Sequence, residues 1–283
     1  MRRSLVTRPD PEVRERRIAG GLFFATCGSV FVVHLFGWQG EAVLSDPSAV
    51  GRAFLFSTTL MAILLAHEMG HYATARAHGF GLSMPWFLPA PILVGTFGAI
   101  IRLRENPRTK TGLLEMGAMG PLAGLAVVVV VLLLRLSLGG PAPESAGGWT
   151  LSPPLLWWVV AWPIIGELPL ISTNDPVAFA AWIGCLVTAM NLIPFGQLDG
   201  GHVFAAVFPK HAGWFAWLVT VALLAGGYFW PGWAVWAVLL HLLGTRTPVQ
   251  VKREQQPLSV RALWLAVALI LAFALCFTPV PIS

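Results

Sequence analysis

Apolar runs of about the length that crosses a lipid bilayer recur along this chain. They cover residues 18–38, 51–75, 113–138, 176–194, 212–243 and 261–278. A helix of about 20 apolar residues spans the roughly 30 Å hydrocarbon core of a membrane. Charged residues make up only 11% of the 283 residues, against about 25% in a typical soluble domain. The sequence therefore predicts an all-α polytopic membrane protein with about six transmembrane helices, forming a single integral membrane domain over 1–283.

The fifth run, 212–243, is too long for one straight span. Gly226, Gly227, Pro231 and Gly232 lie within it, and glycine and proline interrupt helices. We therefore expect two short helices, 212–229 and 232–244, joined by a turn. A pair of membrane crossings and a re-entrant hairpin both fit this pattern.

The basic residues predict which side of the membrane each connection faces. All but two of the 18 Lys and Arg residues fall in segments 1–17, 76–112 and 246–261 or at Lys210. Lys and Arg collect in short cytoplasmic loops, so we expect a basic cytoplasmic tail over 1–17 and a multi-pass protein of the cell inner (cytoplasmic) membrane. The expected outer loops contain acidic residues and no Lys or Arg: Glu41, Asp46, Glu144, Glu167 and Asp175. We expect the Trp- and Pro-rich stretch 139–175 to be an extracytoplasmic or re-entrant loop.

The formal net charge of +5 does not indicate nucleic-acid binding. Such binding needs Lys and Arg gathered on one accessible face of a soluble fold. Here the basic residues lie in short breaks between apolar runs. We therefore expect no nucleic-acid partner.

Polar residues that are costly at membrane depth occur at the end of the second apolar run. His67, Glu68 and His71 form an HExxH pattern there. Residues i and i+4 lie on one face of a helix, so both imidazoles can bind one zinc ion while the glutamate lies beside its open position. Histidines satisfied by hydrogen bonds between helices are the alternative. The pattern favours a zinc site in which Glu68 is the general base.

A third protein ligand is needed if the ion is to keep one position for water. Asp199, in NLIPFGQLDGGHVF directly after the fourth run, is the only acidic residue between Asp175 and Glu254. Pro194 and the nearby glycines interrupt the helix at this point, and irregular backbone at membrane depth is tolerated where it lines a cavity or is buried in protein. Asp199 is preferred to His202 as the ligand, and capping of the following helix is its alternative role.

The two motifs resemble those of the site-two proteases, peptidase family M50, which are zinc metalloproteases that cut substrates inside the membrane. HEMGH is similar to the metal-binding motif of that family and NLIPFGQLDGG to its second motif. The stretch VGTFGAIIRLRENPRTKTGLLEMGAMGPLAG and the ending CFTPVPIS resemble the subgroup of cyanobacterial and chloroplast members. The resemblance implies one zinc ion held by His67, His71 and Asp199. It also implies that Glu68 is the catalytic base and that Asn191 binds substrate or steadies the transition state.

The site and the resemblance together predict an intramembrane zinc endopeptidase. It would hydrolyse peptide bonds within or near the transmembrane segments of single-span membrane proteins in the lipid bilayer, in regulated intramembrane proteolysis, with an adaptor protein as a further partner. A non-hydrolytic zinc-binding transporter or structural protein is one alternative, although transporters tend to repeat halves and no repeat is evident here. A membrane amide hydrolase with a non-protein substrate is another. No PDZ-sized insertion separates GPLAG from the LDG motif, so we expect one protease domain without a PDZ domain.

Two further stretches are expected to support the site. In the resembling family, a membrane-associated re-entrant β-hairpin or loop lies at the place of 92–103 in this chain. We expect its edge to pair with an unwound substrate by strand addition, with 96–99 closest; an ordinary re-entrant packing segment is the alternative. Gly120 and Gly124 form a GxxxG pair, which allows close helix approach, so we expect a packing face behind the zinc helix.

Overall fold

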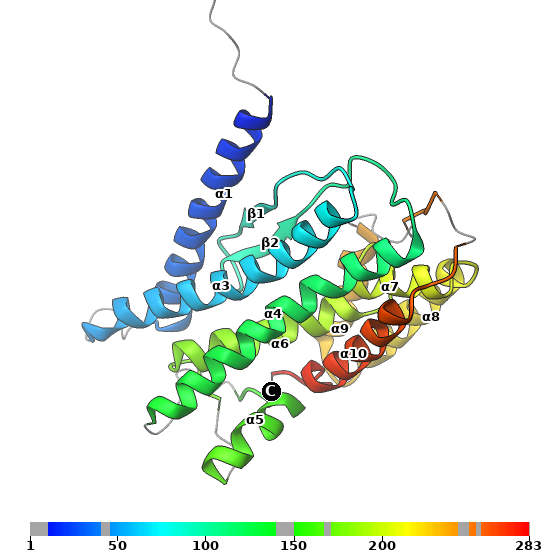
Figure 1. Cartoon of the computed structure of the whole chain (residues 1–283). Helices are drawn as coiled ribbons and strands as arrows, with labels where there is room; N and C mark the ends of the chain where they lie inside the picture. The colour runs from blue at the N-terminus through cyan, green and yellow to red at the C-terminus, as the bar shows by residue number, and fades with distance from the viewer. Residues whose placement is uncertain are drawn as a thin grey trace, which may run out of the picture.

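The computed structural model describes residues 11–40, 46–139, 150–166, 171–242, 249–252 and 256–282, and most of them are helical (Figure 1). The predicted apolar runs all fall on helices. These are α1 (Pro11–Val33) with the π-helix η1 (His34–Trp38), α3 (Ser48–Ala77), α4 (Lys110–Leu138), α6 (Pro176–Leu192), α8 (Ala212–Gly226), α9 (Pro231–Leu242) and α10 (Val260–Cys276). The predicted helical class is thereby confirmed.

Three segments are long and apolar enough to cross a membrane: Glu12–Trp38, Ser48–Ala77 and Lys110–Leu138. The other apolar helices in the described parts of the chain have 10–17 residues. A membrane protein with at least these three candidate spans is therefore supported by length and composition. The predicted total of about six spans stays a prediction.

The predicted interruption of the fifth run is confirmed. Helix α8 ends at Gly226 and α9 begins at Pro231, and Tyr228 N donates to the carbonyl of Ala225 at 3.1 Å in the turn between them. Gly226 lies against the ring of Trp233, to which a Cβ would approach within 3.4 Å. The two helices are therefore packed against each other through a glycine.

The predicted loop 139–175 contains a helix that the sequence analysis did not separate. Residues 140–149 and 167–170 lie outside the described part of the chain. Between them, α5 (Leu155–Ile165) begins directly after Pro154. It buries Trp157 and exposes Trp158 and Trp162. The high tryptophan content thus reflects a short helix with one buried and one exposed face.

The core lies where α3, α4 and α6 run side by side (Figure 1). Buried Phe56, Leu60 and Ile63 of α3 pack there with residues of α4 and α6. Close approach depends on glycine: a Cβ on Gly184 of α6 would lie 2.8 Å from Cγ2 of Val128. A Cβ on Gly70 of α3 would lie 2.3 Å from the carbonyl oxygen of Met119. This close packing holds the second half of α3, with its HExxH motif, directly against α4.

The chain forms a β-hairpin before α4, but it begins earlier than the predicted stretch 92–103. Strand β1 (Trp86–Pro89) pairs antiparallel with β2 (Thr96–Ile100), with Phe87 opposite Ala99. Residues 92–95, predicted as part of the extended stretch, form the turn instead. Gly95 has φ 90° and its N–H donates to the carbonyl of Ile92 at 3.0 Å. The positive φ, which favours glycine, reverses the chain at this point.

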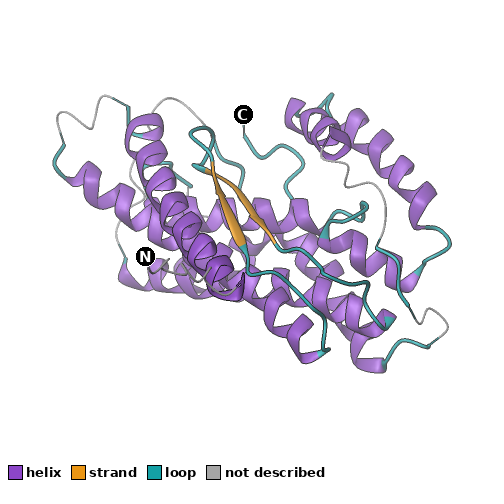
Figure 2. Cartoon of the chain, turned by 90° about the horizontal axis from the view of Figure 1, so that it is seen from above, coloured by secondary structure: helices purple, strands orange, loops and turns teal. Residues whose placement is uncertain are grey.

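The hairpin is attached to α1 along its length. Ser29 Oγ donates to the carbonyl of Ala90 at 3.0 Å, and Trp38 Nε1 donates to that of Leu93 at 2.8 Å. Near the other end of α1, a carboxylate oxygen of Glu15 accepts from the backbone N–H of Met84 at 2.8 Å. Figure 2 shows the two strands beside the helices from a second direction. Helix α1 therefore covers β1, and among the described residues no strand pairs with the outer edge of β2.

We expect Gly95→Ala to destabilise the docked hairpin more than Gly98→Ala. Both glycines have positive φ, 90° and 85°, and alanine costs about 1–2 kcal/mol in such a conformation. Only at residue 95 would the new Cβ lie 2.3 Å from the Cα of Val30, whereas Gly98 has open space. The clash should add about 1–3 kcal/mol. Thermal unfolding of the detergent-solubilised variants checks this, and equal losses would contradict the docking.

Candidate metal centre

Two separate parts of the chain place the predicted ligands. His67 and His71 lie one turn apart on α3, and Asp199 is the first residue of α7 (Asp199–Val207). Between α6 and α7 the chain folds back tightly on itself. A Cβ on Gly200 would lie 2.0 Å from the carbonyl oxygen of Leu192, and one on Gly201 would lie 2.5 Å from that of Gly196. The two glycines after Asp199 therefore permit the return that aims the carboxylate at α3.

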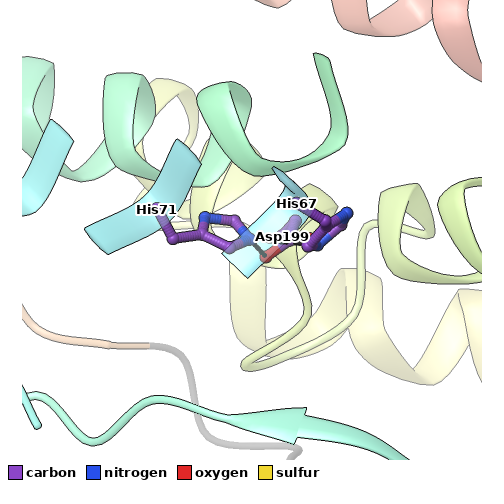
Figure 3. A group of neighbouring side chains, drawn as sticks. All are labelled: His67, His71 and Asp199. Carbon is purple, nitrogen blue, oxygen red and sulfur yellow. Dashed lines mark hydrogen bonds and ion pairs between the residues drawn. The ribbon is translucent and has the colours of Figure 1, made fainter. Parts of the chain in front are cut away.

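The structure brings His67, His71 and Asp199 together as the sequence analysis predicted (Figure 3). The Nε2 atoms of the two histidines are 3.1 Å apart. Carboxylate oxygens of Asp199 lie 3.1 Å from Nε2 of His67 and 3.2 Å from Nε2 of His71. The three side chains are only 6%, 12% and 13% exposed. This arrangement of two imidazole nitrogens and one carboxylate oxygen fits a single divalent metal ion.

A backbone carbonyl orients one of the imidazoles. Nδ1 of His71 lies 2.7 Å from the carbonyl oxygen of Met116 on α4. Because that carbonyl can only accept, the proton of the neutral ring is on Nδ1, and the lone pair of Nε2 points toward Asp199. Such outer hydrogen bonds fix the tautomer of metal-binding histidines. The sequence analysis missed this carbonyl, since a backbone acceptor leaves no signature in residue types.

The remaining predicted residues are placed as follows. Glu68 is half-buried and interacts electrostatically with both histidines and Asp199. His202, the rival ligand, is buried one turn after Asp199 but is not part of the three-ligand group. Asn191 lies in the last turn of α6, and the hydrogen bonds of the described residues include none from it to the ligands. The capping alternative for Asp199 fails, because the carboxylate faces the histidines and Leu198 is the cap residue.

The glycines of α4 form the wall behind the ligands. A Cβ on Gly120 would lie 2.0 Å from Nε2 of His71, and one on Gly124 would lie 3.2 Å from Cβ of His67. A Cβ on Gly117 would lie 3.1 Å from the carbonyl oxygen of Asp199. The predicted packing face is thus confirmed, and it contacts the predicted metal ligands themselves. The GxxxG pair predicted a helix contact, but it did not predict that these glycines contact the side chains of His67 and His71.

Comparison with known families agrees with this geometry. The model of peptidase family M50 matches residues 55–224, which is more than half of the chain. The chain belongs to peptidase family M50. The matched M50 region contains all three ligands together with Glu68 and Asn191, and it also includes the hairpin and the glycine face of α4.

Several curated plant proteins are similar to this M50 chain. Probable zinc metalloprotease EGY2, chloroplastic, from Oryza sativa subsp. indica is 31% identical over 202 residues, covering 69% of this chain and 36% of that protein. The Arabidopsis thaliana protein of the same name is 26% identical over 231 residues, covering 76% and 41%. Probable zinc metalloprotease EGY1, chloroplastic, from Arabidopsis thaliana is 30% identical over 183 residues, covering 62% and 32%. The M50 chain thus spans about a third to two fifths of the length of these relatives.

We expect Gly120→Ala to weaken metal binding about 10–100-fold, the range found when groups that orient metal ligands are altered. The new methyl group would occupy the space of the His71 ring, and alanine otherwise favours a helix. Metal content after dialysis against a competing chelator, measured by mass spectrometry, checks the loss. Gly213→Ala on α8, where a Cβ meets open space, is the matched control. Equal metal affinity in the two variants would contradict the assigned contact.

Proposed function

We propose that this chain is a zinc-dependent endopeptidase that hydrolyses peptide bonds within or near the transmembrane segments of membrane proteins. The observation that carries the proposal is that Asp199 of α7 meets His67 and His71 beside Glu68. The two histidines and Glu68 lie on α3, a helix long and apolar enough to span a membrane. The names of the plant relatives support the same activity. Single-span proteins as substrates, regulated intramembrane proteolysis and an adaptor protein are the finer parts of this proposal.

The donor set and its spacing support zinc as the ion. Zinc is commonly bound tetrahedrally by His nitrogen and carboxylate oxygen at about 2.0–2.2 Å, so two ligand atoms are separated by roughly 3.3 Å or slightly more. The two Nε2 atoms are 3.1 Å apart, and each lies close to one carboxylate oxygen of Asp199, Oδ2 at 3.1 Å for His67 and Oδ1 at 3.2 Å for His71. Three protein ligands also leave a fourth position open, which is the pattern of a catalytic rather than a structural zinc site.

The residues around the ligands have distinct roles in the proposed reaction. Zinc, when bound, activates a water molecule and polarises the scissile carbonyl. Glu68 takes the proton of the attacking water and passes it to the leaving amine, so no covalent intermediate with the protein is formed. The hydrogen bond from Nδ1 of His71 to the carbonyl of Met116 fixes the orientation of the His71 ring. Asn191 would bind the substrate backbone or steady the transition state.

We propose that the protein lies in the cytoplasmic membrane with its N-terminus and its site toward the cytoplasm. The grouping of the predicted cytoplasmic segments at one end of the structure supports this orientation. Arg104 pairs with Glu15, and Lys252 pairs with Glu105 at 2.7 Å; the hydrogen bond from Lys252 lowers the pKa of Glu105. Arg135 lies near the C-terminal end of α4, away from the predicted cytoplasmic segment 76–112 that leads into this helix, and it bonds Asp175 at 2.6 Å.

The outer edge of β2 is the proposed docking place for an unwound substrate. A transmembrane helix hides its carbonyls within its own hydrogen bonds, so the substrate must be extended before attack. Strand addition supplies backbone partners for such an extended segment. Helix α1 covers the β1 side of the hairpin, whereas Phe97 on β2 is 64% exposed. We therefore propose that residues 96–99 are the part of the hairpin that lies closest to the bound substrate.

Substitution of Glu68 by Gln should retain zinc and reduce cleavage of a membrane-embedded reporter substrate by at least about 100-fold, the contribution expected of a general base. His71→Ala should lose both zinc and activity. Zinc analysis and single-turnover cleavage in liposomes measure the two properties separately. A Glu68→Gln variant that keeps its zinc and cleaves normally would remove the proposed base.

Assays of the wild-type protein distinguish the alternative functions. A wild-type protein that holds zinc and moves it across liposome membranes, without cleaving any membrane protein, would indicate a transporter. Release of a small amine from a lipid amide, with intact protein substrates, would indicate a non-peptide amide hydrolase. Proteomic comparison of cells carrying the wild-type protein with cells carrying the Glu68→Gln variant then identifies the substrates that accumulate.

Cross-linking tests the docking edge. We expect a cysteine at position 97 to cross-link to a cysteine near the cleavage site of a substrate held by the Glu68→Gln variant. A cysteine at Ile92, which is 53% exposed but lies in the hairpin turn, is the matched control and should react far less. Both positions are outside the ligand set, so zinc content should be unchanged. Equal cross-linking from the two positions would contradict strand addition on β2.

A further inference from the structure

An apolar cleft of about 250 Å³ lies beside the connection between α6 and α7. Ile193 and Pro194 of that connection form one wall, and Ala222 and Gly226 of α8 form another. The rings of Trp233 and Phe277 form further walls from α9 and from the end of α10. The cleft thus lies where three short apolar helices meet the segment that leads to Asp199.

The lining offers almost no polar group to a ligand. Its side chains are aliphatic or aromatic apart from the indole N–H of Trp233, and that group donates to the carbonyl of Pro279 at 2.7 Å. A cavity of about 150 Å³ lined in the same way stays dry and accepts small hydrocarbons. Water would find no partner here, so the cleft is suited to an apolar occupant.

The cleft is separate from the metal centre but adjoins its support. None of the ligands, nor Glu68 or Asn191, is among the lining residues. The wall residue Ile193 nevertheless packs on α7, since a Cβ on Gly200 would lie 2.8 Å from its carbonyl oxygen. Gly200 directly follows Asp199. The cleft and Asp199 therefore lie on either side of the same connection between α6 and α7.

Exposed apolar side chains surround the mouth of the cleft. Val221 and Leu224 of α8 are 61% and 50% exposed, and Phe229 at the rim is 70% exposed. The chain has three other helices long enough to span a membrane, and an exposed apolar surface of this kind suits contact with lipid hydrocarbon. Two of the lining residues, Ala222 and Phe229, are themselves exposed, so the cleft opens onto the surface of α8.

We propose that the cleft binds the end of a lipid hydrocarbon chain, which fills the space behind the Ile193–Pro194 connection. The bound chain contacts the stacked rings of Trp233, Phe273 and Phe277 on one side and the Ile193–Pro194 connection on the other. This site is independent of peptide hydrolysis, because it requires neither zinc nor substrate.

The proposal is tested by photolabelling the full chain in phosphatidylcholine nanodiscs that contain a trace of phosphatidylcholine with a diazirine near the end of one acyl chain. We expect adducts to concentrate on Ala222, Gly226 and Phe277 relative to the freely exposed Val221. Ala222→Phe fills the cleft and should reduce the Phe277 adducts by about tenfold, since excluding two methylene groups suffices for that change. Val221→Phe, on the neighbouring exposed face of α8, is the matched control and should leave the Phe277 adducts unchanged.

A competition experiment on the wild-type chain avoids any dependence on how the variants fold. An unlabelled free fatty acid should displace the Phe277 adducts in a saturable manner while the adducts on exposed residues fall only in proportion to dilution. Labelling that is uniform over the exposed apolar residues, does not saturate and is unaffected by Ala222→Phe would overturn the proposal. Metal content measured on the same samples shows whether the metal centre is intact, so a failed cleft and a failed metal site are distinguishable.

Discussion

Two imidazoles and a carboxylate share a largely buried site. The need to pair the buried carboxylate of Asp199 with the two histidines is the constraint on which the rest of the fold depends. An isolated carboxylate in apolar surroundings is costly, so buried charges are paired or bind metals. Asp199 reaches both histidines at 3.1–3.2 Å, although the chain separates it from them by more than a hundred residues. The core of α3, α4 and α6, the fold-back at Gly200 and the start of α7 all serve to keep these three groups together.

Helix α4 is the element that makes the approach possible. Its glycines let the backbone touch the ligand side chains, and its Met116 carbonyl accepts the Nδ1 proton of His71. The second ring nitrogen of a metal-binding histidine usually donates to a carboxylate, a backbone carbonyl or water. Here one carbonyl on a bare helix surface fills that role, so the polar groups at membrane depth remain few.

The sequence revealed the parts of the site that depend on residue type and local spacing. HExxH places His67 and His71 on one helical face, and the scarcity of acidic residues singled out Asp199. Other features arise only from contacts between distant segments. The Met116 carbonyl has no side-chain signature, and Gly120 looks like any small residue at a helix interface. The first hairpin strand was missed because Trp86–Pro89 is too short for a clear alternating pattern, and α5 because its prolines and tryptophans resemble a loop.

The attachment of the hairpin to α1 links the substrate edge to the surrounding bilayer. Ser29, Trp38 and Glu15 fasten the hairpin at three levels of one helix, and that helix has an apolar stretch of membrane length. Helices adjust their tilt to match the thickness of the hydrocarbon layer. A change in the tilt of α1 would carry β2 with it while the ligands stay in the α3–α4–α6 core. Bilayer thickness would thereby change the distance between the outer edge of β2 and the group formed by His67, His71 and Asp199.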